Sequence, residues 1–524
     1  MSNQHPAEGG SFASRFGAIM SMTGMCVGMG SVWRFPYMVG QYGGGSFIVA
    51  FVICMLAIVL PLAIIECGIG KGMGKGMIGV FTDGLKNGVA GKIFGAVFSL
   101  GYYSMNFFYY VVLTASVFFI YSSAVGEWNT TPPEEIYASF SQHSTVIAVI
   151  SVILVAATIF VIMKGVDAGI EKLSKIMIPL MFLFFIAVIF FCVFCIDGIE
   201  EGYNWYLQPS LTALKNPEIW MAALGQALFS VGVGPGCVLI YGSHLQKNSD
   251  VTLSMATVCM LTCSVGVIVG MAMIPACIAM GLNPESGSML IFVIIPTLLS
   301  RIPFGRFVGV LLFAAIFFAG FSTALAQTEI AVSTFATDLK WGRKKASLIF
   351  GGINVVAAIW AAYSMGFYNF WNDFSGNYLF IITAGIGAIV YIYIIGAEKV
   401  RRNYLNPSSD IRLGRWFSKY VQFLAAPAMV FVMINSLVPI LRSDAVSFAR
   451  ADVAKSLTIP TIVTLVLIVA LLFGITIFML FKCITTKERS EEEIAEYLRD
   501  NAMPEKIVEA EPLVEKPESL QFPE

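Results

Sequence analysis

The chain has 524 residues, of which 57% are hydrophobic and only 12% are charged. A soluble globular domain carries about 25% charged residues, so this composition excludes a soluble protein and indicates one that lies in the lipid bilayer. The net charge of −1 gives no sign of a nucleic-acid partner. The sequence has three histidines, no HExxH motif and no Cys/His cluster, so no enzyme is predicted.

Twelve stretches are long enough to cross about 30 Å of hydrocarbon as helices, which takes about 20 residues each. Backbone polar groups cannot stay unpaired in lipid, so the expected fold class is an all-α integral membrane protein with 12 transmembrane helices. Eleven stretches carry no charged residue, and the first contains only Arg34. In chain order they are 16–36, 35–65, 93–126, 144–163, 176–196, 219–243, 251–284, 307–328, 346–372, 374–397, 420–441 and 456–481.

Lysine and arginine are distributed unevenly between the loops on the two sides of the membrane. With a cytoplasmic N-terminus, 25 of the 32 lie in cytoplasmic segments and only six in external ones. Positive residues accumulate on the cytoplasmic side of membrane proteins, so both termini are predicted to be cytoplasmic. We expect a multi-pass protein of the plasma membrane (the inner membrane in a bacterium), with cytoplasmic segments at 1–12 and 485–524.

Two of the spans contain residues that interrupt a helix in mid-membrane. The first has Gly24, Gly28 and Gly30, and the sixth contains LFSVGVGPG at 228–236. Proline lacks a backbone donor, and glycine weakens a helix by about 1 kcal/mol relative to alanine. Small residues that allow close helix packing would explain either break alone. Two breaks five spans apart instead predict a five-plus-five inverted repeat with discontinuous helices 1 and 6 around a binding site.

Several long motifs resemble those of the sodium:neurotransmitter symporter family, which includes the bacterial leucine transporter. They are GMGSVWRFP at 28–36, GGGSF at 43–47, KGVDAGIEKLSKIMIP at 164–179, NPEIWMAALGQALFS at 216–230 and FFAGFSTALAQTE at 317–329. The resemblance implies a transporter domain at 13–484. Within it, repeat one spans about 13–196, repeat two about 217–397, and two extra helices about 415–484.

The resemblance implies one sodium site between the broken first helix and the eighth helix. Its ligands would be the carbonyls of Gly24, Val27 and Ala319 and the hydroxyls of Ser322 and Thr323. Sodium is a hard cation that prefers oxygen ligands, and unwound backbone supplies carbonyls that no helix uses. The alternative is that the two hydroxyls only bond to carbonyls one turn earlier.

A possible second sodium site is altered relative to the family. Its residues would be Cys26, Ser31, Ser230 and Thr262, and Ser31 and Thr262 stand where the family usually has asparagines. Hydroxyls are shorter than amides, which leaves open whether this site is weaker, completed by water or absent. Chloride is not expected, because Phe51 and Gly266 replace the family's tyrosine and serine, although Gln226 remains.

The resemblance places an amino-acid substrate between the two breaks, with its carboxylate toward the amides near Cys26 to Gly30. Tyr110 matches the family tyrosine that binds this carboxylate, and Phe229 matches the aromatic lid. Gly28 stands where monoamine transporters carry an aspartate, so the substrate is expected to bring its own carboxylate. The predicted substrate-binding residues are Met25, Cys26, Met29, Gly30, Asn106, Tyr110, Phe229, Ser230, Gly232, Pro235, Thr323 and Gln327.

Two of these residues, Asn106 and Gln327, replace aliphatic residues of the leucine transporter. Buried amides require partners, so the pair favours a substrate with a polar or aromatic-hydroxyl side chain. The alternative is that the two amides bond to each other or to water.

Arg34 is expected to face the external vestibule, because an arginine in lipid would cost about 2.5–3.5 kcal/mol. Its partner would be Asp373, or Asn369 in another placement of a small insertion, and the pair would close an outer gate above Tyr110 and Phe229. The family's inner ion pair is missing. We expect a different cytoplasmic closure, with Phe12, Ser243 and His244 as candidates.

Together these features predict a sodium-coupled symporter of an amino acid that works by alternating access and needs no obligate protein partner. A proton-coupled or uncoupled permease of the same fold and a non-transporting amino-acid sensor are the alternatives.

Overall fold

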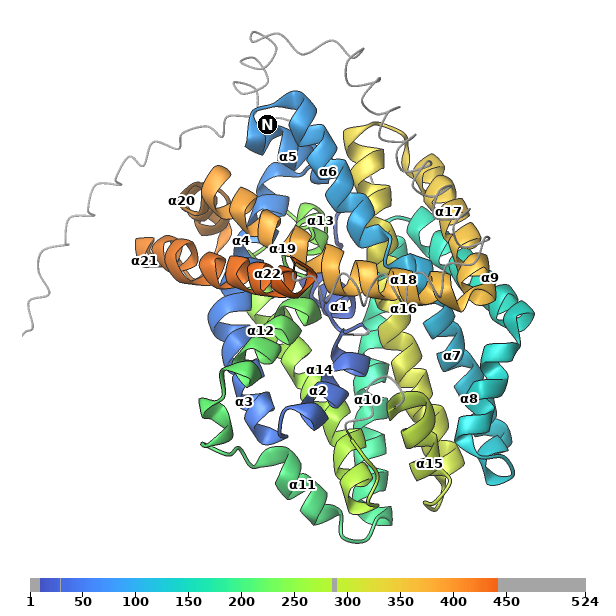
Figure 1. Cartoon of the computed structure of the whole chain (residues 1–524). Coiled ribbons are helices and arrows are strands. Elements are labelled where there is room, and N and C mark those ends of the chain that lie inside the picture. The colour runs from blue at the N-terminus through green and yellow to red at the C-terminus, as the bar shows by residue number, and fades with distance from the viewer. Residues whose placement is uncertain (1–9, 29, 285–289, 442–524) are drawn as a thin grey trace, which may run out of the picture.

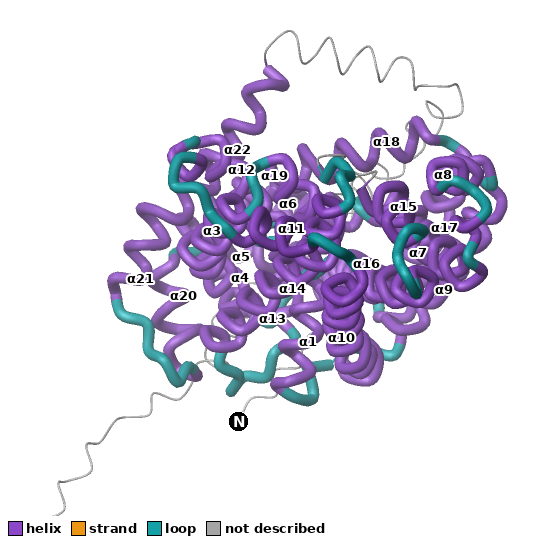
Figure 2. Tube along the Cα trace, turned by 90° about the horizontal axis from the view of Figure 1, so that it is seen from below, coloured by secondary structure: helices purple, strands orange, loops and turns teal. Residues whose placement is uncertain are grey.

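The computed structural model describes residues 10–28, 30–284 and 290–441, and within these ranges all regular structure is helical (Figures 1 and 2). Eight described helices are long and apolar enough to cross a membrane, or ten if each of two bent pairs counts as one span. The expected span at 456–481 lies outside the described residues. The longer helices are α3 (Gly45–Cys54) with α4 (Leu60–Met73), α6 (Gly88–Tyr103), α7 (Asn106–Val125), α9 (Ser144–Met163), α10 (Lys172–Cys195), α14 (Val251–Ala279), α16 (Gly305–Asp338), α17 (Arg343–Tyr363) and α22 (Ala426–Leu441).

Shorter helices connect and cover these. They are α2 (Phe35–Gln41), α5 (Met77–Leu85), α8 (Pro133–Gln142), α11 (Ile199–Leu207), α15 (Ile295–Leu299), α18 (Met365–Asp373), α19 (Phe380–Ala388), α20 (Ala397–Val400) and α21 (Arg415–Tyr420).

The first and sixth expected spans are both interrupted. The first consists of α1 (Arg15–Cys26) and, after a π-helical turn at Gly30–Arg34, α2; the two parts are inclined by 57°. The sixth consists of α12 (Pro217–Val231) and α13 (Cys237–Ser243), separated by a non-helical segment. In that segment Gly232, Gly234 and Gly236 have φ of 70°, 105° and 100°, a region that favours glycine.

Helix α1 lies in the middle of the molecule, where it packs against α10, α14 and α16 and also contacts α12 and α13 (Figure 1). Its first turn is capped by Ser14, whose hydroxyl accepts from the amide of Gly17 at 3.1 Å. This packing brings the break in α1 against α16 and close to the broken α12–α13 pair.

Two expected spans run past the acid that ends their charge-free stretch, and they do so for one reason. A charge-free stretch ends at its first acid, yet α4 continues past Glu66 to Met73 and α16 continues past Glu329 to Asp338. Both acids are fully buried and hydrogen-bonded, so neither has to end a span. The expected helix at 346–372 is instead divided, because Ser364 ends α17 and caps α18.

Candidate functional site

The break in α1 lies directly against two hydroxyls of α16. The Ser322 hydroxyl donates to the carbonyls of Gly24 and Ala319, both at 2.8 Å. The Thr323 hydroxyl lies 3.2 Å from the same Gly24 carbonyl and 3.3 Å from that of Ala319. Four of the five predicted sodium ligands are therefore brought together. The fifth, Val27, is the C-cap residue that directly follows α1.

The chemistry of this cluster fits a monovalent, oxygen-preferring cation. All four candidate ligand atoms are neutral oxygens, two from carbonyls and two from hydroxyls. The side chains of Ser322 and Thr323 that carry the hydroxyls are buried. The described residues contain no group of three or more His, Cys, Asp or Glu that could hold a metal ion. When bound, a sodium ion would supply a positive charge at the break. The Ser322 and Thr323 hydroxyls of α16 already hold α1 in place through the Gly24 carbonyl.

Gly28 gives a direct test of this contact. A Cβ atom built on Gly28 would lie 2.1 Å from the Thr323 hydroxyl oxygen, so a side chain there must displace Thr323 from Gly24. Gly28→Ala should weaken the apparent sodium affinity by about tenfold, the order expected for loss of one hydrogen-bonding group. Thermal unfolding of the purified protein against sodium concentration measures this. Gly352→Ala in α17 is the matched control, because nothing lies within 4 Å of its added Cβ.

The break between α12 and α13 is held by a buried carboxylate. Glu66 of α4 accepts from the amide of Gly234 at 2.6 Å, and Tyr391 lies 3.3 Å from the Gly234 carbonyl as its donor. A Cβ on Gly234 would lie 2.3 Å from the Cα of Ala384, so only glycine fits here. Gly232 and Pro235, two predicted substrate residues, lie buried in this same segment.

The residues of the possible second sodium site are all buried, but most make other contacts. The Cys26 thiol lies 3.5 Å from the Val231 carbonyl, and the Thr262 hydroxyl donates to the Val258 carbonyl of its own helix at 2.8 Å. The Gln226 amide donates to the Gly30 carbonyl at 2.6 Å and to the Ser230 hydroxyl at 3.1 Å. Among the described atoms, the Ser31 hydroxyl and the Gln226 carbonyl oxygen have no hydrogen-bond partner. Oxygen ligands are thus available here, and several of them are already bonded to other groups of the chain.

Asn106 and Gln327 are both buried between α7 and α16 with their carbonyl oxygens unpaired among the described atoms. The Asn106 amide donates to the Thr328 hydroxyl at 3.1 Å, and the Gln327 amide contacts the sulfur of Met105 at 4.0 Å. The two amides have no hydrogen bond to each other in the structure. Each therefore presents a buried acceptor without a donor.

The structure places Tyr110 differently from the expectation. Its hydroxyl lies 3.5 Å from that of Thr328, and its carbonyl accepts from Thr114 and Ser151. None of these contacts of Tyr110 is with α1. A two-residue turn at Ser104 and Met105 separates α6 from α7, four residues before Tyr109. The neighbouring Tyr109 has its hydroxyl beside Gly320 of α16, where a Cβ would lie 3.9 Å away.

The two charged residues of the predicted outer gate are not paired in this structure. The Arg34 guanidinium lies 5.3 Å from the centroid of the Phe229 ring, and both residues line a cavity of about 630 Å³. Asp373 instead accepts from its neighbour Asn372 at 3.3 Å, so the expected Arg34–Asp373 pair is not formed. The cavity is bordered by α12 and α19, and Phe229 packs on Phe380 with 5.0 Å between ring centroids.

The remaining predicted residues are less informative. Met25 is buried in α1, a Cβ on Gly30 would lie 2.8 Å from the Phe229 ring, and Met29 lies outside the described residues.

At the expected chloride position, Phe51 packs on Phe35 with 4.8 Å between ring centroids, and a Cβ on Gly266 would meet that same Phe35 ring. An apolar cluster thus occupies the place where the family has polar groups.

Residues 10–139 and 128–483 match the sodium:neurotransmitter symporter family. The chain belongs to this family. An uncharacterised sodium-dependent transporter of Methanocaldococcus jannaschii is 29% identical over 445 residues, which are 81% of this chain and 89% of that protein. A second one, from Haemophilus influenzae, is 25% identical over 450 residues, 81% of this chain and 98% of that protein. The crystal structure of MhsT in complex with L-phenylalanine has a TM-score of 0.72 at 25% identity and covers 82% of this chain and 99% of MhsT.

Family membership confirms the resemblance read from the motifs. The chain is a sodium-dependent transporter and a multi-pass membrane protein, not an enzyme. Its all-helical fold matches that of MhsT.

The end of this transporter that carries residue 10 is closed by contacts that the sequence predicted only in part. The Phe12 amide donates to the His244 carbonyl at 2.9 Å, and the Phe12 ring is buried 6.0 Å from that of Tyr241. Phe12 and His244 thus join the N-terminal segment to the end of α13. Ser243 instead donates to the Ile240 carbonyl of its own helix.

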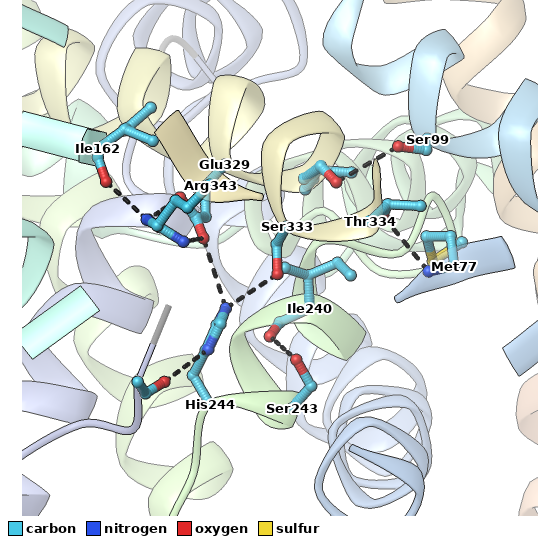
Figure 3. A network of polar contacts seen from close by, with 12 residues as sticks. Met77, Ser99, Ile162, Ile240, Ser243, His244, Glu329, Ser333, Thr334 and Arg343 are labelled. Carbon is cyan, nitrogen blue, oxygen red and sulfur yellow. Dashed lines mark hydrogen bonds and ion pairs between the residues drawn. The ribbon is translucent and has the colours of Figure 1, made fainter. Parts of the chain in front are cut away.

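Two residues at this closed end were not predicted. Arg343 donates to both carboxylate oxygens of Glu329, at 2.9 and 2.7 Å (Figure 3). Asp338 accepts from the backbone amides of Gly76 and Gly79 at the start of α5. A lone acid in an apolar stretch requires a partner, and Arg343 is one of the basic residues that follow α16 in sequence. That signal was available for Glu329 but not for Asp338.

Proposed function

We propose that this chain is a sodium-coupled secondary active symporter of an amino acid that works by alternating access. The observation that carries the proposal is the convergence of the Ser322 and Thr323 hydroxyls on the Gly24 carbonyl, at a break in α1. An ion held there would fix the broken helix against α16, and a fixed break offers its free amides to a carboxylate. The bound L-phenylalanine in MhsT supports an amino acid as the substrate class.

The buried acceptors of Asn106 and Gln327 favour a substrate whose side chain carries a hydrogen-bond donor. An unpaired buried acceptor costs about 1–3 kcal/mol, and a hydroxyl or amide on the substrate would remove that cost. A purely aliphatic side chain would leave both oxygens unpaired. A polar or aromatic-hydroxyl amino acid is therefore the proposed substrate.

The proposal includes twelve spans in a five-plus-five inverted repeat, with both termini in the cytoplasm and the protein in the plasma membrane. The lysine and arginine bias supports this orientation. The cavity lined by Arg34 and Phe229 would then face the outside, and the end closed by Phe12 would face the cytoplasm. Closure of the outer gate would bring Arg34 to Asp373.

Transport by the purified protein in liposomes tests the coupling. A thermal-shift screen of the twenty amino acids, with and without sodium, should first identify an amino acid that stabilises the protein only in sodium. Uptake of that amino acid should then fall to the background of empty liposomes when external sodium is replaced by choline. Unchanged uptake in choline would contradict sodium coupling.

A proton-coupled carrier of the same fold is the second candidate, because Cys26 and Thr262 of the second sodium site are hydrogen-bonded to other groups of the chain. Such a carrier would keep its uptake in choline and lose it when the proton gradient is collapsed. Stabilisation by an amino acid without any uptake would instead indicate a sensor.

A further inference from the structure

His244 is a buried titratable residue between the N-terminal segment and α16 (Figure 3). Its Nδ1 lies 2.9 Å from the Gly10 carbonyl, and its backbone carbonyl accepts from the Phe12 amide. On the other side, its Nε2 lies 3.2 Å from the Ser333 hydroxyl and 3.4 Å from a carboxylate oxygen of Glu329. This one imidazole therefore connects both parts that must separate if this end of the transporter is to open.

The hydrogen bonds define the two protonation states of the ring. A carbonyl can only accept, so Nδ1 carries a hydrogen toward Gly10 in both states. In the neutral ring, Nε2 is an acceptor and takes the hydroxyl hydrogen of Ser333. In the charged ring, Nε2 also carries a hydrogen, which faces the Ser333 oxygen and the Glu329 carboxylate. Protonation thus replaces a neutral hydrogen bond with a charge-assisted one and strengthens the bond to Gly10.

The groups around His244 are compatible with this change. From α16 the ring faces Glu329, which Arg343 of α17 also binds, so the carboxylate is shared between two cations when the ring is charged. From α13 the nearest titratable group is Tyr241, in contact with Phe12. Next to Gly10 lies the Asp167 carboxylate, 3.8 Å from where a Cβ on Gly10 would be.

Further from the ring, Glu171 binds the start of α1 through Ala13 and Ser14 and is paired with Lys175 at 2.6 Å. Glu171 is thus already paired, and Asp167 is an acid that does not oppose a positive charge on the ring. The like charge near the ring is that of Arg343, which donates at 2.9 Å to the same Glu329 oxygen that faces Nε2.

We propose that His244 is a pH-dependent positioning residue, which holds this end of the transporter closed more tightly when its imidazole is protonated. Imidazole is the side chain that proteins most often use as a pH-sensitive contact, so the test compares an acidic with a mildly alkaline buffer. Opening must break either the Gly10 and Phe12 side or the Glu329 and Ser333 side of the ring. Either separation removes a bond that protonation strengthens, so acid should slow opening whichever side moves.

Hydrogen exchange of the Phe12 amide in the full-length protein tests this, because that amide donates to the His244 carbonyl. The protection factor, corrected for the pH dependence of chemical exchange, should be about tenfold higher at about pH 5.5 than at about pH 8. In His244→Gln this ratio should fall to about one, because glutamine can bond Gly10 and Ser333 but cannot gain a charge. Sodium-dependent thermal stabilisation at pH 8 identifies variants that fold.

Two further variants complete the test. His143→Gln is the matched control, because His143 is exposed and bonds only within its own segment, at Ser139; it should keep the wild-type ratio. Ser333→Ala removes the partner of the neutral ring but leaves Glu329, so its ratio should equal or exceed that of the wild type. Equal protection at both pH values, or an unchanged ratio in folded His244→Gln, would overturn the proposal. The measurement needs no substrate, so a failure to transport amino acids would leave it unaffected.

Discussion

Sodium should no longer stabilise or drive this transporter once Ser322 and Thr323 have both lost their hydroxyls. In the variant Ser322→Ala with Thr323→Val, the Gly24 and Ala319 carbonyls remain, but the two side-chain oxygens that meet them are gone. A hard cation left with backbone carbonyls alone loses the ligands that join α1 to α16. We expect sodium-dependent uptake to fall to the level measured in choline.

The size of this effect follows from the driving force. One sodium ion that enters through about 100 mV gains about 2.3 kcal/mol, which corresponds to roughly 50-fold accumulation of a coupled solute. Loss of the ion from this site would lower the limiting accumulation ratio of the solute by that factor. The accumulation ratio in liposomes with a fixed membrane potential therefore measures the contribution of the site directly.

Thr328→Val is the matched control for the double variant. Thr328 is also a buried hydroxyl of α16, but it contacts Asn106 rather than α1. Sodium-dependent stabilisation should persist in the control and disappear in the double variant. If the double variant kept its uptake and its dependence on sodium, the ion would have to bind elsewhere, and the account of the α1 break would be wrong.

Much of this arrangement could be predicted from the sequence, because glycine and proline act locally. Gly232, Gly234 and Gly236 adopt positive φ in the structure, so the interruption of the sixth span follows from residue type alone. The first span also breaks beside a glycine, Gly28, although Gly28 has no positive φ. The identity of Ser322 and Thr323 as the facing hydroxyls came from the family motifs, and the packing of α1 on α16 brings them to Gly24.

Side-chain directions and pairings between distant helices could not be predicted in the same way. The Tyr110 hydroxyl lies 3.5 Å from that of Thr328 in α16, a pairing between distant helices that no local sequence pattern marks. Arg34 lies over the Phe229 ring rather than beside Asp373, and both Arg34 and Phe229 line one cavity. A sequence does not specify which of several conformations a structure will represent.

Glu66→Ala should destabilise the break between α12 and α13 and with it the whole substrate region. The Glu66 carboxylate accepts the Gly234 amide hydrogen at 2.6 Å and also faces the amides of Gly236 and Leu239. Alanine would leave the Gly234 donor buried without a partner, at a cost of about 1–3 kcal/mol. We expect a lower melting temperature and at least a tenfold loss of uptake.

Glu66→Gln separates the hydrogen bond from the charge, because the amide oxygen of glutamine can still accept from Gly234. If the carboxylate acts as a clamp on the unwound backbone, the glutamine variant should recover most of the stability lost in the alanine variant. If both variants were equally unstable, the negative charge itself would be required, as expected when several amides point at one anion. If neither variant changed stability or uptake, the segment at 232–236 would hold its shape without Glu66. The α12–α13 break would then depend on its glycines and on Tyr391 alone.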